Sequence, residues 1–110
     1  MRYNLRFLPC VEDDAVAGYS WYEEKAPGCG DDFLRIFYAG LDQIEINPFQ
    51  YPKVYLEFRR SLLRKFPYAT YYKIEGDVVI VFGLFHCARN PQSIRLGLRE
   101  RDKDDKDIGL

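Results

Sequence analysis

The fold is decided by residues 15–48, which read AVAGYSWYEEKAPGCGDDFLRIFYAGLDQIEINP. Apolar side chains recur every three or four residues on both sides of the turn sequence at 27–30, which predicts amphipathic helices over residues 12–26 and 31–46. Gly18 weakens the first helix unless a neighbour packs closely against it. Two helices joined by so short a turn lie antiparallel, as a helical hairpin. The repeating positions are Ala15, Tyr19, Tyr22 and Ala26, then Phe33, Phe37, Leu41 and Ile44.

Segments on either side of this hairpin predict β-strands. Residues 2–8, 54–59 and 68–74 alternate between polar and apolar side chains, as strands with one buried face do. Residues 78–85 are almost wholly apolar, which indicates a central strand, and Glu75-Gly76-Asp77 before them indicates a hairpin turn. The expected fold is therefore an α+β domain with an N-terminal strand, an antiparallel helical hairpin and a three-stranded antiparallel meander, β-α-α-β-β-β.

The 110 residues suit one domain, predicted over residues 1–101, with residues 102–110 as a disordered acidic tail. No apolar run reaches the ~18 residues of a membrane span, and no charged-then-apolar leader is present. Three cysteines without a CxxC pair disfavour a disulfide framework or a zinc knuckle. We therefore expect a bacterial cytoplasmic protein without a membrane partner.

The net charge of −1 hides an uneven distribution. Residues 1–52 carry four basic and nine acidic side chains, whereas residues 53–101 carry ten basic and four acidic ones. The positive second half predicts a surface that faces anions or a partner. Generic nucleic-acid binders usually have an isoelectric point above ~9, and this chain has 5.8. The acidic residues 12–14, at the start of the first helix, are expected to be solvated.

The sequence lacks the familiar catalytic motifs. It contains no Gly-rich phosphate loop, GxSxG, HExxH or Rossmann fingerprint, and one histidine cannot build a multi-histidine metal site. No cofactor and no metal are therefore expected. The remaining candidates are the cationic segment RRSLLRKFPY at 59–68, the pair Tyr71-Tyr72, and the segment HCARNP at 86–91. We expect them to meet on a sheet backed by the helix pair.

These segments resemble the RelE/ParE toxin superfamily. Its C-terminal half runs from an arginine-rich strand through Phe-Pro-Tyr and Tyr-Tyr to a closing His-x-x-Arg-x-Pro, the order found at 59–91 in RRSLLRKFPYATYYKIEGDVVIVFGLFHCARNP. Upstream, WYEEKAPGCGDDFLRIFYAGLDQIEINPFQYP, at 21–52, is similar to the family's helix pair. The resemblance covers residues 3–91 and implies the fold that the periodicity already predicts.

The resemblance implies the toxin of a type II toxin–antitoxin (plasmid stabilisation) module, neutralised by a cognate antitoxin protein. ParE-like members bind DNA gyrase, whereas RelE-like members cleave mRNA in the ribosomal A site. Metal-free cleavage needs groups that activate the 2′-hydroxyl, stabilise the phosphorane and protonate the leaving oxygen. If the chain is such an endoribonuclease, the candidate catalytic residues are Arg64, His86 and Arg89. The candidates for binding the target or the antitoxin are Arg59, Arg60, Lys65 and Tyr55.

Two departures from the RNA-cleaving pattern favour the ParE-like branch. RNA-cleaving relatives tend to be strongly basic and to end in a catalytic tyrosine or His-Tyr pair, but this chain has an isoelectric point of 5.8 and no tyrosine after Tyr72. Phosphate electrostatics dominate ribosome binding. The first hypothesis is therefore a toxin that binds gyrase and is not an enzyme. The alternatives are a ribosome-dependent mRNA endonuclease and an inactive, decayed toxin-like domain.

Each candidate residue also has a structural interpretation. His86 would brace the turn that follows it, the cations at 59–65 would line a solvated strand face, and one of Tyr71 and Tyr72 would be core while the other could stack on a base. The antitoxin segment is expected to be disordered until it docks a helix in a groove or adds a strand to a sheet edge. The candidate aromatic anchors for it are Phe49, Tyr51 and Tyr55.

Overall fold

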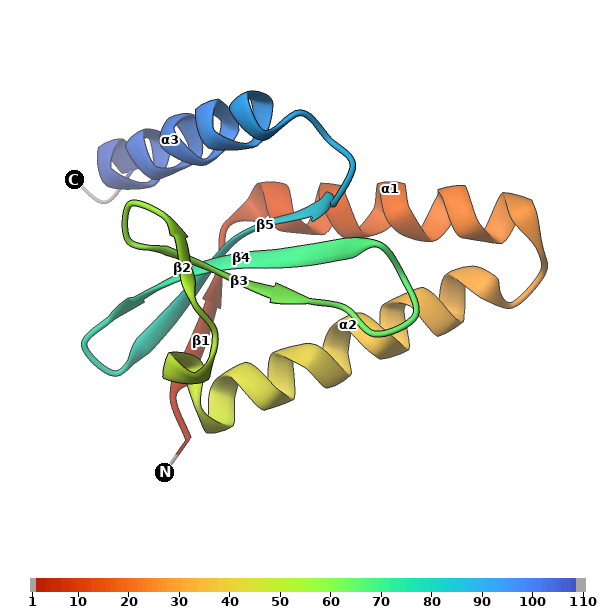
Figure 1. The fold of residues 1–110 in the computed structure, drawn as a ribbon, viewed down its shortest axis with the longest axis horizontal. Helices are drawn as coiled ribbons and strands as arrows, with labels where there is room; N and C mark the ends of the chain where they lie inside the picture. Colours follow the sequence, from red (N-terminus) through yellow and green to blue (C-terminus); the bar gives the residue numbers. More distant parts are fainter. Residues whose placement is uncertain (1, 109–110) are drawn as a thin grey trace.

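The computed structural model describes residues 2–108. It contains one five-stranded mixed sheet in the order β1-β5-β4-β3-β2, with helices on both faces (Figure 1). The strands are β1 (Asn4–Phe7), β2 (Lys53–Tyr55), β3 (Phe58–Leu62), β4 (Tyr68–Glu75) and β5 (Val78–His86). The helices are α1 (Pro9–Lys25), α2 (Cys29–Ile46), α3 (Pro91–Ile108) and the short 3-10 helix η1 (Pro48–Gln50).

The predicted helical hairpin is confirmed, with α1 and α2 antiparallel on one face of the sheet (Figure 1). Helix α1 begins at Pro9, three residues earlier than expected, because a proline at the first helical position has no N–H group to lose. The close approach predicted at Gly18 is present: a Cβ there would lie 2.5 Å from two ring carbons of Phe33. The absence of a side chain at Gly18 therefore lets the two helices and their aromatic filling come together.

The antiparallel meander has four strands, β2 to β5, one more than predicted. Residues 54–59, expected as a single strand, form the hairpin β2–β3, in which Tyr55 pairs with Phe58. The chain turns at Leu56, whose φ of 50° is in the left-handed region that favours glycine or asparagine. A leucine gives no turn signal in a sequence, which is why the hairpin was not predicted. At the other edge, β1 lies parallel to β5, the strand predicted to be central.

Helix α3 replaces most of the predicted disordered tail. It continues through residues 102–108, and Gly109 and Leu110 lie outside the described residues. Its buried apolar side chains are Ile94 and Leu98. Its C-terminal half is held by charge: Arg6 donates two hydrogen bonds to Asp105, at 2.9 and 3.0 Å, and Lys73 donates to Asp102 at 3.1 Å. Within residues 2–108, no helix is long and apolar enough to cross a bilayer.

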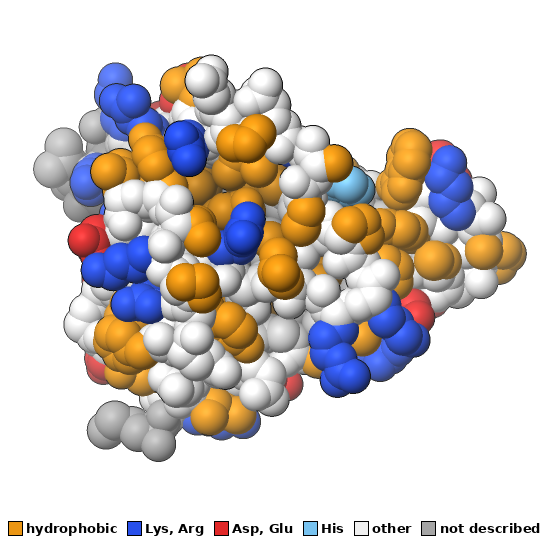
Figure 2. All heavy atoms as spheres, in the orientation of Figure 1, with side chains coloured by type: hydrophobic (Ala, Val, Ile, Leu, Met, Phe, Trp, Pro, Cys, Tyr) orange, Lys and Arg blue, Asp and Glu red, His pale blue; other side chains and the backbone are white. Residues whose placement is uncertain are grey.

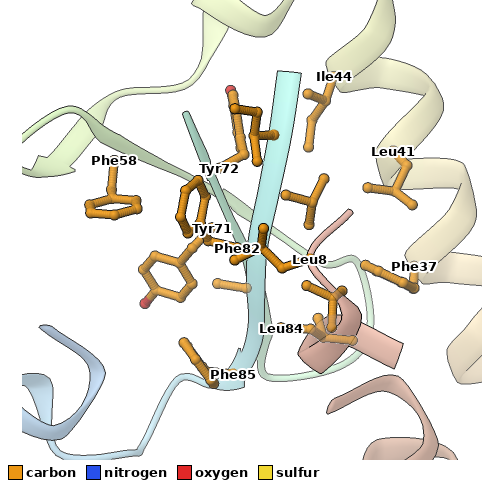
Figure 3. Close-up of a cluster of buried hydrophobic side chains, with 14 of the residues drawn as sticks. Leu8, Phe37, Leu41, Ile44, Phe58, Tyr71, Tyr72, Phe82, Leu84 and Phe85 are labelled. Atoms are coloured by element: carbon orange, nitrogen blue, oxygen red, sulfur yellow. The ribbon is translucent and has the colours of Figure 1, made fainter. Parts of the chain in front are cut away.

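Helices on both faces give the sheet two cores, and Figure 3 shows side chains of both. Tyr71 and Tyr72 are both buried, which corrects the prediction that only one is core. On the side of the sheet that faces the helical hairpin, the Tyr72 hydroxyl donates a 2.6 Å hydrogen bond to the Pro48 carbonyl. On the α3 side, Tyr71 packs against Phe85 with ring centroids 5.6 Å apart. Neither tyrosine ring offers a free face on which a base could stack.

The Arg6–Asp105 pair predicts acid-dependent attachment of α3. The hydrogen bond from Arg6 holds the pKa of Asp105 below its ordinary value. A carboxyl group whose pKa is lower in the folded protein than in the unfolded chain stabilises the folded state. This stabilisation is complete above the unfolded pKa of about 3.9, and it is lost as the pH falls through the folded pKa. The difference between wild type and Arg6→Gln in the urea midpoint should therefore shrink below about pH 4. A difference independent of pH would contradict this account.

Candidate functional site

The structure brings the two predicted segments together at one end of the sheet. Tyr68 pairs with His86 across β4 and β5, and the amide of Cys87 donates a 2.7 Å hydrogen bond to the carbonyl of Pro67. The loop that follows the cationic strand and the turn that follows β5 are therefore tied side by side. The expected meeting of residues 59–68 and 86–91 is present, on a sheet backed by the helix pair.

His86 braces the turn at the end of β5. Its Nδ1 accepts a 3.0 Å hydrogen bond from the amide of Ala88, and its carbonyl accepts one of 3.1 Å from the amide of Arg89. Its ring lies edge-on to Tyr68, with centroids 5.1 Å apart. Because Nδ1 is the acceptor, the neutral ring carries its proton on Nε2. These contacts agree with the structural interpretation of His86, in which it braces the turn that follows it.

We expect His86→Ala to lower the free energy of unfolding by about 1 kcal/mol, the usual contribution of a hydrogen bond. The measurement is a urea denaturation curve of each protein. Exposed Gln92, the next turn along, provides the control, since its side chain has no hydrogen bond within residues 2–108 and Gln92→Ala should leave the midpoint unchanged. Equal midpoints for wild type and His86→Ala would show that the brace is not important for stability.

Arg64 does not join His86 and Arg89 in one charged centre. It lies in the exposed loop between β3 and β4, and no described contact links its side chain to the other two. Its neighbour Lys65 has a left-handed backbone, with φ 69°, and its Nζ lies 3.8 Å from a carboxylate oxygen of Asp32. Arg89 lies over the ring of Phe85, 4.7 Å from its centroid. His86 and Arg89 line one shallow hollow, whereas Arg64 is not among its lining residues.

The residues predicted to bind a partner also have separate environments. Arg59 donates a 2.6 Å hydrogen bond to the carbonyl of Tyr51 and lies 5.3 Å from the ring centroid of Phe49, so it holds the connector before β2. Tyr55 is half-buried and stacks on Phe58, with the rings 4° from parallel. Of the three predicted anchors, Phe49 is the exposed one, and Tyr51 and Tyr55 pack against the core.

An apolar groove of about 560 Å³ lies where β1 meets α1 and α2. Its exposed rim residues are Phe7, Val16 and Tyr38, which are 44%, 57% and 57% accessible. Strand β1 is the last strand of the sheet, so the groove runs beside an open strand edge. Sequence reasoning did not find this groove, although Val16 and Tyr38 gave a signal: they are apolar and lie off the predicted core stripes.

Sequence reasoning also missed a charged clasp, formed by Asp14 and Arg101. The Arg101 guanidinium donates hydrogen bonds of 2.7 and 3.1 Å to the two carboxylate oxygens of Asp14 and one of 2.8 Å to the carbonyl of Phe82. Asp14 also accepts a 3.1 Å hydrogen bond from the amide of Leu84. The prediction that Asp14 is a solvated residue at the start of the helix is therefore wrong. It joins α1, β5 and α3.

Comparison with known proteins gives one consistent similarity. No family model matches the chain. Its sequence is 26% identical over 102 residues to the protein named Toxin ParE2 in two strains of Mycobacterium tuberculosis, and the alignment covers 92% of this chain and 97% of each relative. Its structure is similar to a solved chain of the chromosomal ParDE TA system from P. aeruginosa. That match has a TM-score of 0.70 and 13% identity, and it covers 77% of this chain and 96% of the other.

In both sequence and fold, the chain is similar to ParE toxins. The predicted resemblance to the RelE/ParE toxin superfamily is confirmed, and the similarity lies on the ParE-like side. The relative named Toxin ParE2 aligns over almost its whole length, so the similarity is not confined to one motif of that protein.

Proposed function

We propose that this chain is the toxin of a type II toxin–antitoxin module. The observation that carries the proposal is its 26% identity to Toxin ParE2 over 97% of that protein. The α+β fold supports it, since the solved chain with the same fold comes from a ParDE TA system. An antitoxin partner follows from the same two similarities.

The proposed mode of action is binding, with DNA gyrase as the target. Three features support binding over RNA cleavage. The Nδ1 atom of His86 is occupied by a backbone amide. Arg64 makes no described contact with His86 or Arg89, and the net charge of −1 gives little general attraction to RNA.

Growth of an expressing strain tests the toxin role. Induced expression of this chain alone should arrest growth, and co-expression of the protein encoded by the adjacent reading frame should restore it. Continued growth with soluble, folded protein would favour the alternative of a decayed, inactive domain. The double variant His86→Ala, Arg89→Ala should remain toxic, because the proposed mode does not use these residues as catalysts.

Two assays on purified components distinguish the targets. Inhibition of gyrase supercoiling by a stoichiometric amount of this chain would support the proposed target. Unaffected supercoiling, together with growth arrest in cells, would reject gyrase but leave the toxin role intact. Primer extension on translated mRNA tests the endonuclease alternative, and cleavage that disappears in the double variant would establish it.

The groove beside β1 is the proposed docking site for the antitoxin. Its apolar walls suit one face of an amphipathic helix, and the open edge of β1 suits an added strand. Residues 1–52, which supply the groove, carry nine acidic side chains against four basic ones. A segment that combines apolar residues with lysine or arginine therefore fits this surface best.

We expect Val16→Glu to weaken antitoxin binding by at least about tenfold, because it places a charge in an apolar contact. Leu96→Glu is the matched control, since Leu96 is also on a helix, is 56% accessible, and lies outside the groove. Binding is measured by calorimetry with the purified antitoxin. Equal affinities for the two variants would show that the antitoxin binds elsewhere, without affecting the toxin role.

A further inference from the structure

A second hollow, of about 110 Å³, lies on the opposite face of the sheet, under the first turns of α3. Its charged lining consists of three arginines from different elements: Arg60 from β3, Arg89 from the turn after β5, and Arg95 from α3. Among the described residues, no Asp or Glu belongs to this lining. The other lining residues are Val54, Tyr55, Tyr71, Cys87, Pro91, Ile94 and Leu98.

The three arginines have no carboxylate partner among the described residues. Eight ion pairs are formed among the described residues, and none of them includes Arg60, Arg89 or Arg95. Like charges that converge on one hollow repel each other unless an anion lies between them. Figure 2 shows Lys and Arg side chains among hydrophobic ones over α3 and the β2–β3 hairpin.

Aromatic rings hold two of these arginines in place. The guanidinium of Arg89 lies 4.7 Å from the ring centroid of Phe85, and that of Arg95 lies 5.5 Å from the ring centroid of Tyr55. Such stacking leaves the edge of a guanidinium, with its N–H donors, available for an oxyanion. The positive charge is thus positioned before any ligand arrives, which lowers the entropic cost of binding.

Tyr71 adds a hydroxyl group to the lining of the hollow. Its side chain lines the hollow and is 96% buried, since only 4% of its surface is accessible. Within residues 2–108, every fully enclosed polar side-chain atom has a hydrogen-bond partner. The Tyr71 hydroxyl has no such partner in that range, so it is not fully enclosed. The hydroxyl therefore keeps access to the hollow and is a free donor at the site of three positive charges.

We infer that this hollow binds a phosphate group, held by Arg60, Arg89 and Arg95 with a hydrogen bond from Tyr71. Arginine edges match the oxygens of phosphate, and a volume of about 110 Å³, a few times the roughly 30 Å³ of one water, suits a small oxyanion. This inference does not depend on the toxin role or on the groove beside β1.

Calorimetry at low ionic strength, with inorganic phosphate as the probe, tests the site. Binding should weaken by about tenfold or more in Arg60→Gln and in Arg95→Gln, the loss expected for one charged hydrogen-bond donor. Arg99→Gln is the matched control, because Arg99 is an exposed arginine of α3 outside this hollow, and it should bind as the wild type does. The same affinity in all four proteins, or no binding to the wild type, would overturn the inference.

Two further measurements complete the test. Tyr71→Phe keeps the ring in the core and removes only the hydroxyl, so it should weaken phosphate binding even if Arg60→Gln folds poorly. Titration with a short uridine oligonucleotide identifies the source of the group. A parallel loss for oligonucleotide and phosphate in Arg95→Gln indicates a nucleic-acid phosphodiester, whereas a loss for phosphate alone indicates a small phosphorylated molecule. Both results support the site.

Discussion

Arg101→Met is expected to lower the free energy of unfolding by roughly 3 kcal/mol, because it leaves a largely buried carboxylate without its counter-ion. The side chain of Asp14 is 13% accessible, and that of Arg101 is 21% accessible. After the substitution, Asp14 would keep one hydrogen bond, from the amide of Leu84. The carbonyl of Phe82 would lose its side-chain donor as well.

Urea denaturation followed by circular dichroism measures this effect. Arg2→Met is the matched control: the Arg2–Glu45 pair has a similar 3.0 Å distance, but Arg2 is 59% accessible. Exposed pairs contribute at most about 1 kcal/mol. The double variant Asp14→Leu, Arg101→Met should cost less than the two single variants added together, since it removes both charges. Equal losses for Arg101→Met and Arg2→Met would show that the clasp contributes no more than a surface pair.

Gly30→Ala is expected to cost roughly 1–3 kcal/mol, the usual penalty for overpacking. A Cβ at Gly30 would lie 2.7 Å from the backbone oxygen of Tyr19 and 2.7 Å from a carbon of its ring. A backbone oxygen cannot rotate away as a side chain can, so α1 and α2 would have to move apart. The separation would loosen the aromatic cluster of Tyr22, Phe33, Phe66 and Tyr68 between them.

The same helix contains the control for this prediction. A Cβ at Gly40 would meet no atom within 4 Å, so Gly40→Ala should gain about 0.5–1 kcal/mol from helix propensity. Two identical substitutions on α2 should therefore shift the thermal midpoint in opposite directions. A stabilised Gly30→Ala protein would mean that the hairpin relaxes without cost, and it would refute the close-packing account.

The parts of the fold that follow from local patterns were predictable. The stripe from Phe33 to Ile44 is buried on α2 as expected, and the apolar run of β5 lies within the sheet. The turn at Leu56 could not be predicted, because its left-handed backbone is imposed on a residue that does not favour it. The continuation of helix α3 beyond residue 101 was not predicted, because its last turns carry few apolar side chains. They are fixed by Arg6 and Lys73, which are distant in the sequence.

The candidate sites were predictable only in part. Arg60 and Arg89 were recognised from the motif order, and they do line one hollow. Arg95 was not recognised, because it belongs to α3, beyond the residues 3–91 that carried the resemblance. Asp14 had the composition of an ordinary helix start, and only the three-dimensional structure shows that it meets Arg101.

The parallel pairing of β1 with β5 bears on how the molecule is made. Asn4 has Val78 as its register partner, and β5 is the one neighbour of β1 among the strands that the structure describes. At roughly 5–20 residues per second, a ribosome needs several seconds to travel from the first of these residues to the second. During that interval the N-terminal segment has no strand to join. Any product of early termination before Val78 would lack β5, the strand through which β1 joins the rest of the sheet.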